Sequence, residues 1–225
     1  MTSAQIPDRV TAVLFDIDGT LVDSNYVHVA AWIPAFFTAG CGVEGWRIHE
    51  SIGMDSAKLL DRLIGDQPEG VRDKAKQEHS ARYAQMSEQL RAFDGARDLL
   101  RAVSARGVKV VLATSAPEDQ LSRLRELLDV EDAIQTVTNA EDVDTAKPAP
   151  DIVQVALEKS GADASEAIFV GDTVWDVEAA NTAGVACVAV QTGGIHEQAL
   201  RSAGAAAVFE TIRELRSDLE ARGLA

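Results

Sequence analysis

The sequence predicts an α/β protein in which a parallel sheet is covered by helices on both faces. From residue 93 onward, short apolar runs alternate with helical patterns. These runs are apolar at nearly every position, which is typical of strands buried on both faces. By contrast, residues 24–91 contain no convincing strand. An all-helical segment is therefore expected to interrupt the α/β core immediately after its first strand.

The first strand is predicted at residues 12–15, where the chain reads AVLF before Asp16 and Asp18. Alternate residues of an extended chain point the same way, so these two carboxylates would crowd one region. In the segment that follows, the sequence predicts three helices, at residues 24–39, 55–64 and 69–91. The stretches AGCGVEG and GDQPEG separate them. Its tryptophans, Trp32 and Trp46, are expected in the core of this segment.

The rest of the chain predicts strands and helices in alternation. The strands are expected at 108–114, 167–172 and 185–190, with weaker ones at 136–140 and 206–209. The helices are expected at 96–106, 117–129, 150–160, 174–183, 196–203 and 210–222. Parallel strands joined by helices place their carboxyl ends along one edge, where functional groups collect.

The net charge and the cysteine count limit which binding partners and which cellular setting we expect. The 225 residues carry a net charge of −15, which argues against binding to nucleic acid or to an anionic membrane. Cys41 and Cys187 have neither metal-ligand nor redox spacing, which favours a reduced, cytoplasmic setting. No apolar run approaches about 18 residues, and the N-terminus lacks the apolar core of a signal peptide. A small-molecule substrate is expected, and no oligomeric state is predicted.

Polar residues follow four of the predicted strands or their loops. They are Asp16 and Asp18, Thr114 and Ser115, Lys147 in TAKPAPD, and Asp172, with Asp176 one helical turn further on. Converging carboxylates repel one another unless a cation lies among them, and all-oxygen ligation suits Mg²⁺. Lys147 precedes a proline, which favours an extended backbone that presents its side chain from a loop. Metal, lysine and hydroxyl groups together predict a site for a phosphoryl group.

Each of these residues can be given a chemical role. Asp16 can attack phosphorus and form an aspartyl-phosphate. Asp18 can protonate the leaving oxygen and then take a proton from water. The remaining candidates, which would bind the phosphoryl oxygens and offset their charge, are Thr114, Ser115 and Lys147.

Taken singly, the same residues have ordinary explanations. Asp172 could cap the following helix, and Lys147 could be a solvated surface lysine. The D-x-D-G pattern could be half of a calcium loop, but its glycine comes two positions early and Val27 occupies the place of the final glutamate. The ordered set at successive strand ends favours one common site.

Four motifs resemble the signature of the haloacid dehalogenase-like superfamily: DIDGTL, VVLATS, AKPAPD and VGDTVWDVEAA. The resemblance implies a Rossmann-like core, residues 1–23 and 93–225, with an inserted helical cap at 24–92. It also implies Mg²⁺ held by Asp16, the backbone carbonyl of Asp18 and Asp172, with Asp176 in support.

The resemblance also bears on the substrate. Dehalogenases of this superfamily carry another residue in place of Asp18, so Asp18 indicates phosphoryl transfer. The stretch DSNYVHVAAW resembles the start of the cap in the β-phosphoglucomutase-like, phosphoglycolate phosphatase-like and sugar-phosphatase subgroup. Candidate substrate contacts in the cap are His28, Arg47 and Lys58, although His28 could pack on a helix face and the others could be solvated.

We therefore expect a Mg²⁺-dependent phosphatase that acts on a small phosphorylated metabolite, such as a sugar phosphate or phosphoglycolate. The alternative enzyme is a β-phosphoglucomutase-like isomerase. Two departures weaken it: SAPED stands where those mutases place a lysine, and Gly171 stands where they carry an acid. A catalytically idle binding module is the non-enzyme alternative, but a scaffold has no reason to gather mutually repelling carboxylates.

Overall fold

The computed structural model describes residues 5–142 and 147–225, so Ala146 of the third motif lies outside the described residues. Its sheet is entirely parallel, with strand order β3-β2-β1-β4-β5-β6. The strands are β1 (Ala12–Phe15), β2 (Lys109–Ala113), β3 (Thr136–Thr138), β4 (Ala167–Gly171), β5 (Ala186–Val190) and β6 (Ala207–Phe209). The α/β class with a parallel sheet, predicted from the alternating apolar runs, is confirmed, and so is the Rossmann-like core that the family resemblance implied.

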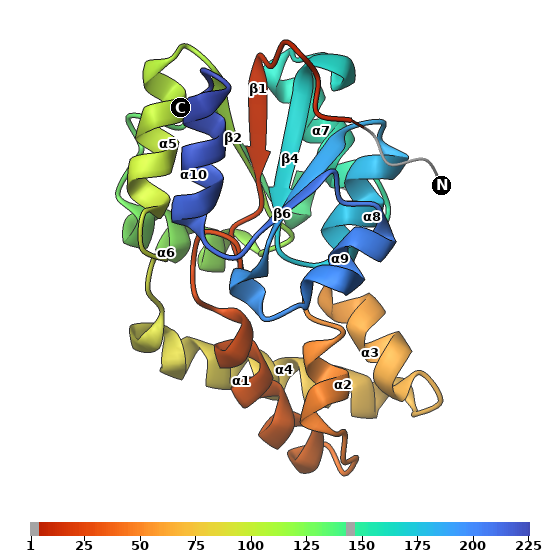
Figure 1. The fold of residues 1–225 in the computed structure, drawn as a ribbon. Coiled ribbons are helices and arrows are strands. Elements are labelled where there is room, and N and C mark those ends of the chain that lie inside the picture. The colour runs from red at the N-terminus through yellow and green to blue at the C-terminus, as the bar shows by residue number, and fades with distance from the viewer. Residues whose placement is uncertain (1–4, 143–146) are drawn as a thin grey trace.

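Helices cover both faces of this sheet (Figure 1). On one face lie α5 (Ala96–Ala105), α6 (Glu118–Leu128) and α10 (Ile212–Ala221), and on the other lie α7 (Asp151–Ser160), α8 (Val174–Thr182) and α9 (Glu197–Ala203). Strand β1 shows why its sequence is apolar throughout. Val13 and Phe15 pack with the first group of helices, whereas Ala12 and Leu14 pack with the second.

The inserted segment forms four α-helices with a separate apolar cluster. They are α1 (Asn25–Thr38), α2 (Gly45–His49), α3 (Ser56–Ile64) and α4 (Glu69–Met86). Trp32, Phe36, Leu60 and Ile64 are buried together there. Among the described residues, no helix is both long and apolar enough to cross a membrane.

The short helix α2 was not predicted, and the expectation that Trp46 is buried is wrong. Trp46 is 63% exposed, whereas Ile48 in the same helix is fully buried. A helix of five residues buries one narrow stripe, and positions two apart lie on different sides of a helix. Ile48 occupies the buried side, so Trp46 faces solvent.

The strand register places the functional residues on one line. Phe15 of β1 pairs with Leu112 of β2 and with Val170 of β4. Asp16, Thr114 and Asp172 therefore follow the ends of three adjacent strands within one or two residues of that line. In Figure 1 the helices α1 to α4 lie beyond this edge of the sheet.

Candidate active site

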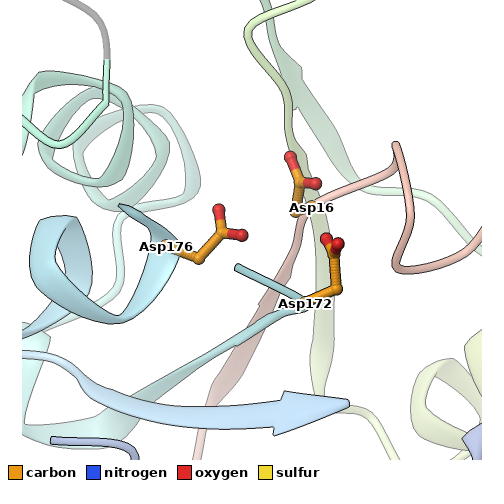
Figure 2. A group of neighbouring side chains, drawn as sticks. All are labelled: Asp16, Asp172 and Asp176. Atoms are coloured by element: carbon orange, nitrogen blue, oxygen red, sulfur yellow. The ribbon is translucent and has the colours of Figure 1, made fainter. Parts of the chain in front are cut away.

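Three buried carboxylates meet at the carboxyl edge of the sheet. Asp16 follows β1, Asp172 follows β4, and Asp176 lies in the first turn of α8. One oxygen from each lies within 4.8 Å of the others, and Figure 2 shows the three groups gathered around one region. Oxygen ligands so close together suit a divalent cation such as Mg²⁺.

Lys147 bridges two of these carboxylates. Its Nζ lies 2.6 Å from Oδ1 of Asp16 and 2.6 Å from Oδ1 of Asp176. The lysine side chain is 2% exposed, so water screens these ion pairs very little. The structure thus brings the first, third and fourth sequence motifs into direct contact.

Asp172 and Asp176 are held by different means. Asp172 accepts hydrogen bonds from Thr20 Oγ1 at 3.0 Å and from Asn25 Nδ2 at 2.7 Å. Asp176 accepts from the backbone N–H and the hydroxyl of Thr173, in a capping box at the start of α8. Thr173, not Asp172, is therefore the residue that caps this helix, and the carboxylate of Asp172 is directed into the acidic cluster.

The backbone approaches Asp172 closely on one side. A Cβ atom at Gly193 would lie 1.7 Å from Asp172 Oδ2, and one at Gly19 would lie 2.4 Å from the same oxygen. Gly19 also has φ +73, a conformation that favours glycine. Because neither glycine has a side chain, the carboxylate of Asp172 has space beside the backbone at both positions.

The carboxylate of Asp18 lies outside this group of three. Its Oδ1 accepts a hydrogen bond of 2.6 Å from Ser24 Oγ, and Nε2 of His28 is 3.6 Å away. Burial acts to raise the pKa of Asp18, but the neighbouring His28 and the hydrogen bond from Ser24 outweigh it and lower that pKa. Asp18 is therefore held apart from the cluster, in reach of the first helix of the insert.

The cluster carries more negative charge than Lys147 can balance. Burial raises the pKa of Asp16 to about 8, the charges of Asp176 and Asp18 act in the same direction, and Lys147 opposes them. Burial and the charges of Asp176 and Asp16 raise the pKa of Asp172 well above its ordinary value. For Lys147, burial acts to lower the pKa, but the two neighbouring carboxylates raise it. A bound cation would relieve this repulsion.

The second motif supplies hydroxyl groups beside the acids. Thr114 is buried, and its Oγ1 accepts a hydrogen bond from the backbone N–H of Ala116 at 3.0 Å. The Oγ of Ser115 is buried and has no hydrogen-bond partner among the described residues. Both residues line the same cavity as Asp16 and Lys147. A free hydroxyl at this place is available to a phosphoryl oxygen.

This cavity, of about 120 Å³, lies between the strand ends and the inserted helices. His28 lines it, whereas Arg47 and Lys58 are not among its lining residues. Arg47 instead lies 3.4 Å from Glu44. Lys76 and Ser80, one turn apart on α4, line the cavity from the side of the inserted helices.

Sequence reasoning missed several of these residues. Thr20 and Asn25 are polar residues inside a buried stretch, which is a usable signal for a functional role. His79 also lines the cavity, in a helix rich in charged residues. Its signal is weaker: Ala75, His79 and Tyr83 recur every fourth residue, which places them on one buried face of α4.

The fold and the acidic site define a hydrolase, and the chain belongs to the haloacid dehalogenase-like hydrolase family, whose model matches residues 10–184. Among curated relatives, a phosphoglycolate phosphatase of Pseudomonas savastanoi pv. phaseolicola is 29% identical over 210 residues, covering 90% of this chain and 77% of the relative. The family and the enzyme class predicted from the motifs are thereby confirmed.

Solved structures show the same fold. A hydrolase from Pseudomonas syringae superimposes with a TM-score of 0.89 at 31% identity, covering 94% of this chain and 98% of the other. A Bacteroides vulgatus protein described as a β-phosphoglucomutase superimposes with a TM-score of 0.86 at 25% identity, covering 97% and 90%. The fold is thus similar to both hydrolases and mutases, and only the site can separate these activities.

Proposed function

We propose that the protein is a Mg²⁺-dependent phosphatase that hydrolyses a small phosphate monoester through an aspartyl-phosphate on Asp16. The observation that carries this proposal is the buried group of Asp16, Asp172 and Asp176, with Lys147 at 2.6 Å from two of its members. The phosphatases among its relatives support the same activity.

The residues present fit a magnesium ion. The donors are all oxygen atoms and are buried, and burial together with the charges of neighbouring carboxylates raises the pKa values of Asp16 and Asp172. We infer that Asp16, Asp172 and the backbone carbonyl of Asp18 would hold the ion, with Asp176 in support. Bound there, Mg²⁺ would supply charge stabilisation to the phosphoryl oxygens.

The reaction itself divides among the protein side chains. Asp16 Oδ attacks phosphorus while the bond to the leaving oxygen breaks, and Asp18 gives that oxygen its proton. Lys147 and the hydroxyls of Thr114 and Ser115 bind the phosphoryl oxygens. Asp18 then takes a proton from the water that hydrolyses the aspartyl-phosphate. The surroundings of Asp18 lower its pKa in the free protein, and the negative charge of a bound phosphate would act to raise that pKa.

The dimensions of the cavity favour a small substrate. A volume of about 120 Å³ falls below the range of roughly 300–1,000 Å³ usual for drug-sized ligands. Lys76 places a cation on the cap side, which favours a leaving group that is itself an anion. Phosphoglycolate, a small phosphate monoester with a carboxylate, meets both conditions and is the first substrate to test.

Two features disfavour the mutase. A Cβ atom at Gly171 would lie 2.5 Å from Cβ of Asp176, so an acidic side chain has no room there. Glu118 lies in the stretch where the mutases place a lysine. It accepts a hydrogen bond from Asn139 at 2.6 Å and is not among the residues that line the cavity. The residues directly after the second motif, Ala116 to Asp119, include no cation that could bind a second phosphate.

Release of inorganic phosphate tests the proposal. The protein is incubated with p-nitrophenyl phosphate, with and without Mg²⁺, and then with a panel of phosphorylated metabolites that includes phosphoglycolate. Mg²⁺-dependent turnover is expected, with the highest kcat/KM for a small anionic ester. No phosphate release from any compound in Mg²⁺ would refute it and leave the mutase or the idle binding module.

We also propose the division into a core of residues 1–23 and 93–225 and a cap of 24–92. The separate apolar cluster of α1 to α4 supports it. A cytoplasmic location is proposed as well, because Cys41 and Cys187 are both free thiols.

A further inference from the structure

Two histidines of the cap form a pair beside the catalytic acids. His79 of α4 lies with its Nε2 3.1 Å from Nδ1 of His28 in α1. His79 is only 4% exposed, and both residues line the cavity. At this separation one ring nitrogen donates a hydrogen bond to the other.

The pair continues to Asp18. The second nitrogen of His28, Nε2, lies 3.6 Å from Oδ1 of Asp18. Ser24 donates to that same oxygen at 2.6 Å. A continuous line of polar contacts therefore runs from Asp18 in the core, through His28, to His79 in the last helix of the cap.

Aromatic packing holds both rings in place. The ring of His79 stacks on Trp32 with centroids 3.9 Å apart, and the ring of His28 stacks on Tyr83 at the same separation. Trp32 and Tyr83 are themselves buried. Rings packed in this way have little freedom to rotate, so the hydrogen bond between the two histidines fixes the direction in which His28 presents Nε2.

His79 can form a hydrogen bond with Nδ1 of His28 whether or not that nitrogen carries a proton. Burial, together with the charge of His28, lowers the pKa of His79 to about 2, so its ring stays neutral. A neutral imidazole can accept or donate at Nε2, depending on its tautomer. His79 can therefore keep Nδ1 of His28 paired whether that nitrogen carries a proton or not.

We propose that His79 is a positioning residue for the phosphatase reaction, holding His28 so that His28 keeps the carboxyl group of Asp18 aimed at the leaving oxygen. This inference rests on the proposed function, in which Asp18 protonates that oxygen. His79 undergoes no net proton change and touches no reacting atom. Its effect is confined to steps in which Asp18 moves a proton.

That restriction supplies a sharp test. An alkoxide leaving group needs the proton from Asp18, whereas p-nitrophenolate is a stable anion that departs without it. With enzyme in excess, a single turnover reports only the first step, namely release of the alcohol or phenol. Phosphoglycolate and glycerol 2-phosphate serve as the alkyl substrates, and p-nitrophenyl phosphate is the aryl substrate.

Three substitutions separate the hydrogen bond from the packing. His79→Phe keeps a ring to stack on Trp32 but removes both nitrogens. His79→Gln places an amide where Nε2 lies, whereas His79→Asn is too short to reach it. We expect His79→Phe and His79→Asn to slow release from the alkyl phosphates by at least about tenfold, which is part of the roughly 10²–10⁴-fold that acid–base catalysis contributes. Release from the aryl phosphate should stay within about twofold, and His79→Gln should restore most of the alkyl rate.

Phe36→Leu is the matched control, because Phe36 stacks on Trp32 in the same cluster without joining the histidine pair. Any loss in this variant should be equal for alkyl and aryl substrates. Equal losses for both substrate types in the His79 variants, or no loss, would overturn the positioning role. If His79→Phe does not fold, the comparison of Asn with Gln decides the question. A wild-type protein that releases neither product would refute the proposed function instead.

Discussion

The ammonium group of Lys147 lies 2.6 Å from Oδ1 of Asp16, across 131 residues of sequence. The same nitrogen is 2.6 Å from Asp176, so one buried cation faces two carboxylates, and Asp172 adds a third. Breaking such a buried arrangement by removing one charge leaves others unpaired, which is why its members act as a unit. The excess of negative charge in this group underlies the predictions that follow.

Asp16→Asn should abolish turnover and leave the fold intact. The amide has nearly the same size but cannot attack phosphorus, and it is a poorer ligand for Mg²⁺. A loss of at least about 10³-fold in kcat, roughly 4 kcal/mol, is expected. Circular dichroism and phosphate release measure the two outcomes, and Asp23→Asn, at an exposed carboxylate nearby, should keep full activity. A variant that retained a tenth of the wild-type rate would show that Asp16 is not the nucleophile.

Removal of metal should stop the reaction. EDTA is expected to eliminate phosphate release, and added Mg²⁺ to restore it. Ca²⁺ should inhibit, because it takes six to eight ligands at longer distances and would misalign the Asp16 oxygen with phosphorus. Activity that persists undiminished in EDTA would contradict the metal site formed by Asp16 and Asp172.

The sheet and the acidic group could be predicted because local rules determine them. A strand buried on both faces must be apolar throughout, and parallel connections bring the ends of β1, β2 and β4 to one edge. The residues after those strands, Asp16, Thr114 and Asp172, therefore had to lie close together. No contact with a distant partner was needed to predict them.

The cap residues could not be predicted in the same way, because their surroundings depend on helix packing. His79 stands among charged residues in the sequence, and only the packing of α4 against α1 turns it toward His28. Arg47 and Lys58 carry the right charge for a substrate contact, but the structure does not bring them to the cavity. Charge alone does not indicate which face of a cap helix meets the core.

The protein without metal should lose stability as the pH rises from 6.5 to 8. The pKa of Asp16 is raised to about 8 in the folded state, from an ordinary value of 3.8. Over this interval the folded state holds a proton on Asp16 that the unfolded state has lost, so the free energy of unfolding falls, by up to about 1.4 kcal/mol per pH unit. Below pH 6.5, His79 acts in the opposite direction, because its lowered pKa makes protonation favour the unfolded state.

Urea unfolding in EDTA at several pH values measures this slope. Asp16→Asn removes one of the titrating groups and should reduce this slope, while Mg²⁺ should stabilise the wild type more at pH 8 than at pH 6.5 because cation and proton compete. A wild-type stability that is constant or rises over this interval would show that Asp16 is not protonated in the metal-free protein.

The products formed from β-glucose 1-phosphate should distinguish phosphatase from mutase. Both reactions pass through the same aspartyl-phosphate on Asp16, and they differ in whether water or a second sugar hydroxyl accepts the phosphoryl group. A mutase must hold a sugar bisphosphate in two orientations and exclude water, which requires a cation for each phosphate. Here Pro117 lines the cavity, Glu118 accepts a hydrogen bond from Asn139, and Asp119 is exposed, so none of these three residues supplies such a cation.

We therefore expect β-glucose 1-phosphate, where it is accepted, to yield glucose and inorganic phosphate. The assay couples the reaction to glucose 6-phosphate dehydrogenase, with a trace of glucose 1,6-bisphosphate as primer, and follows free phosphate in parallel. Replacing Glu118 by lysine supplies the cation that the mutase pattern would place after the second motif. The variant should bind the bisphosphate more tightly, because an added positive charge near the cavity attracts the second phosphate. Rapid, stoichiometric formation of glucose 6-phosphate by the wild type, with little free phosphate, would establish the mutase in place of the phosphatase.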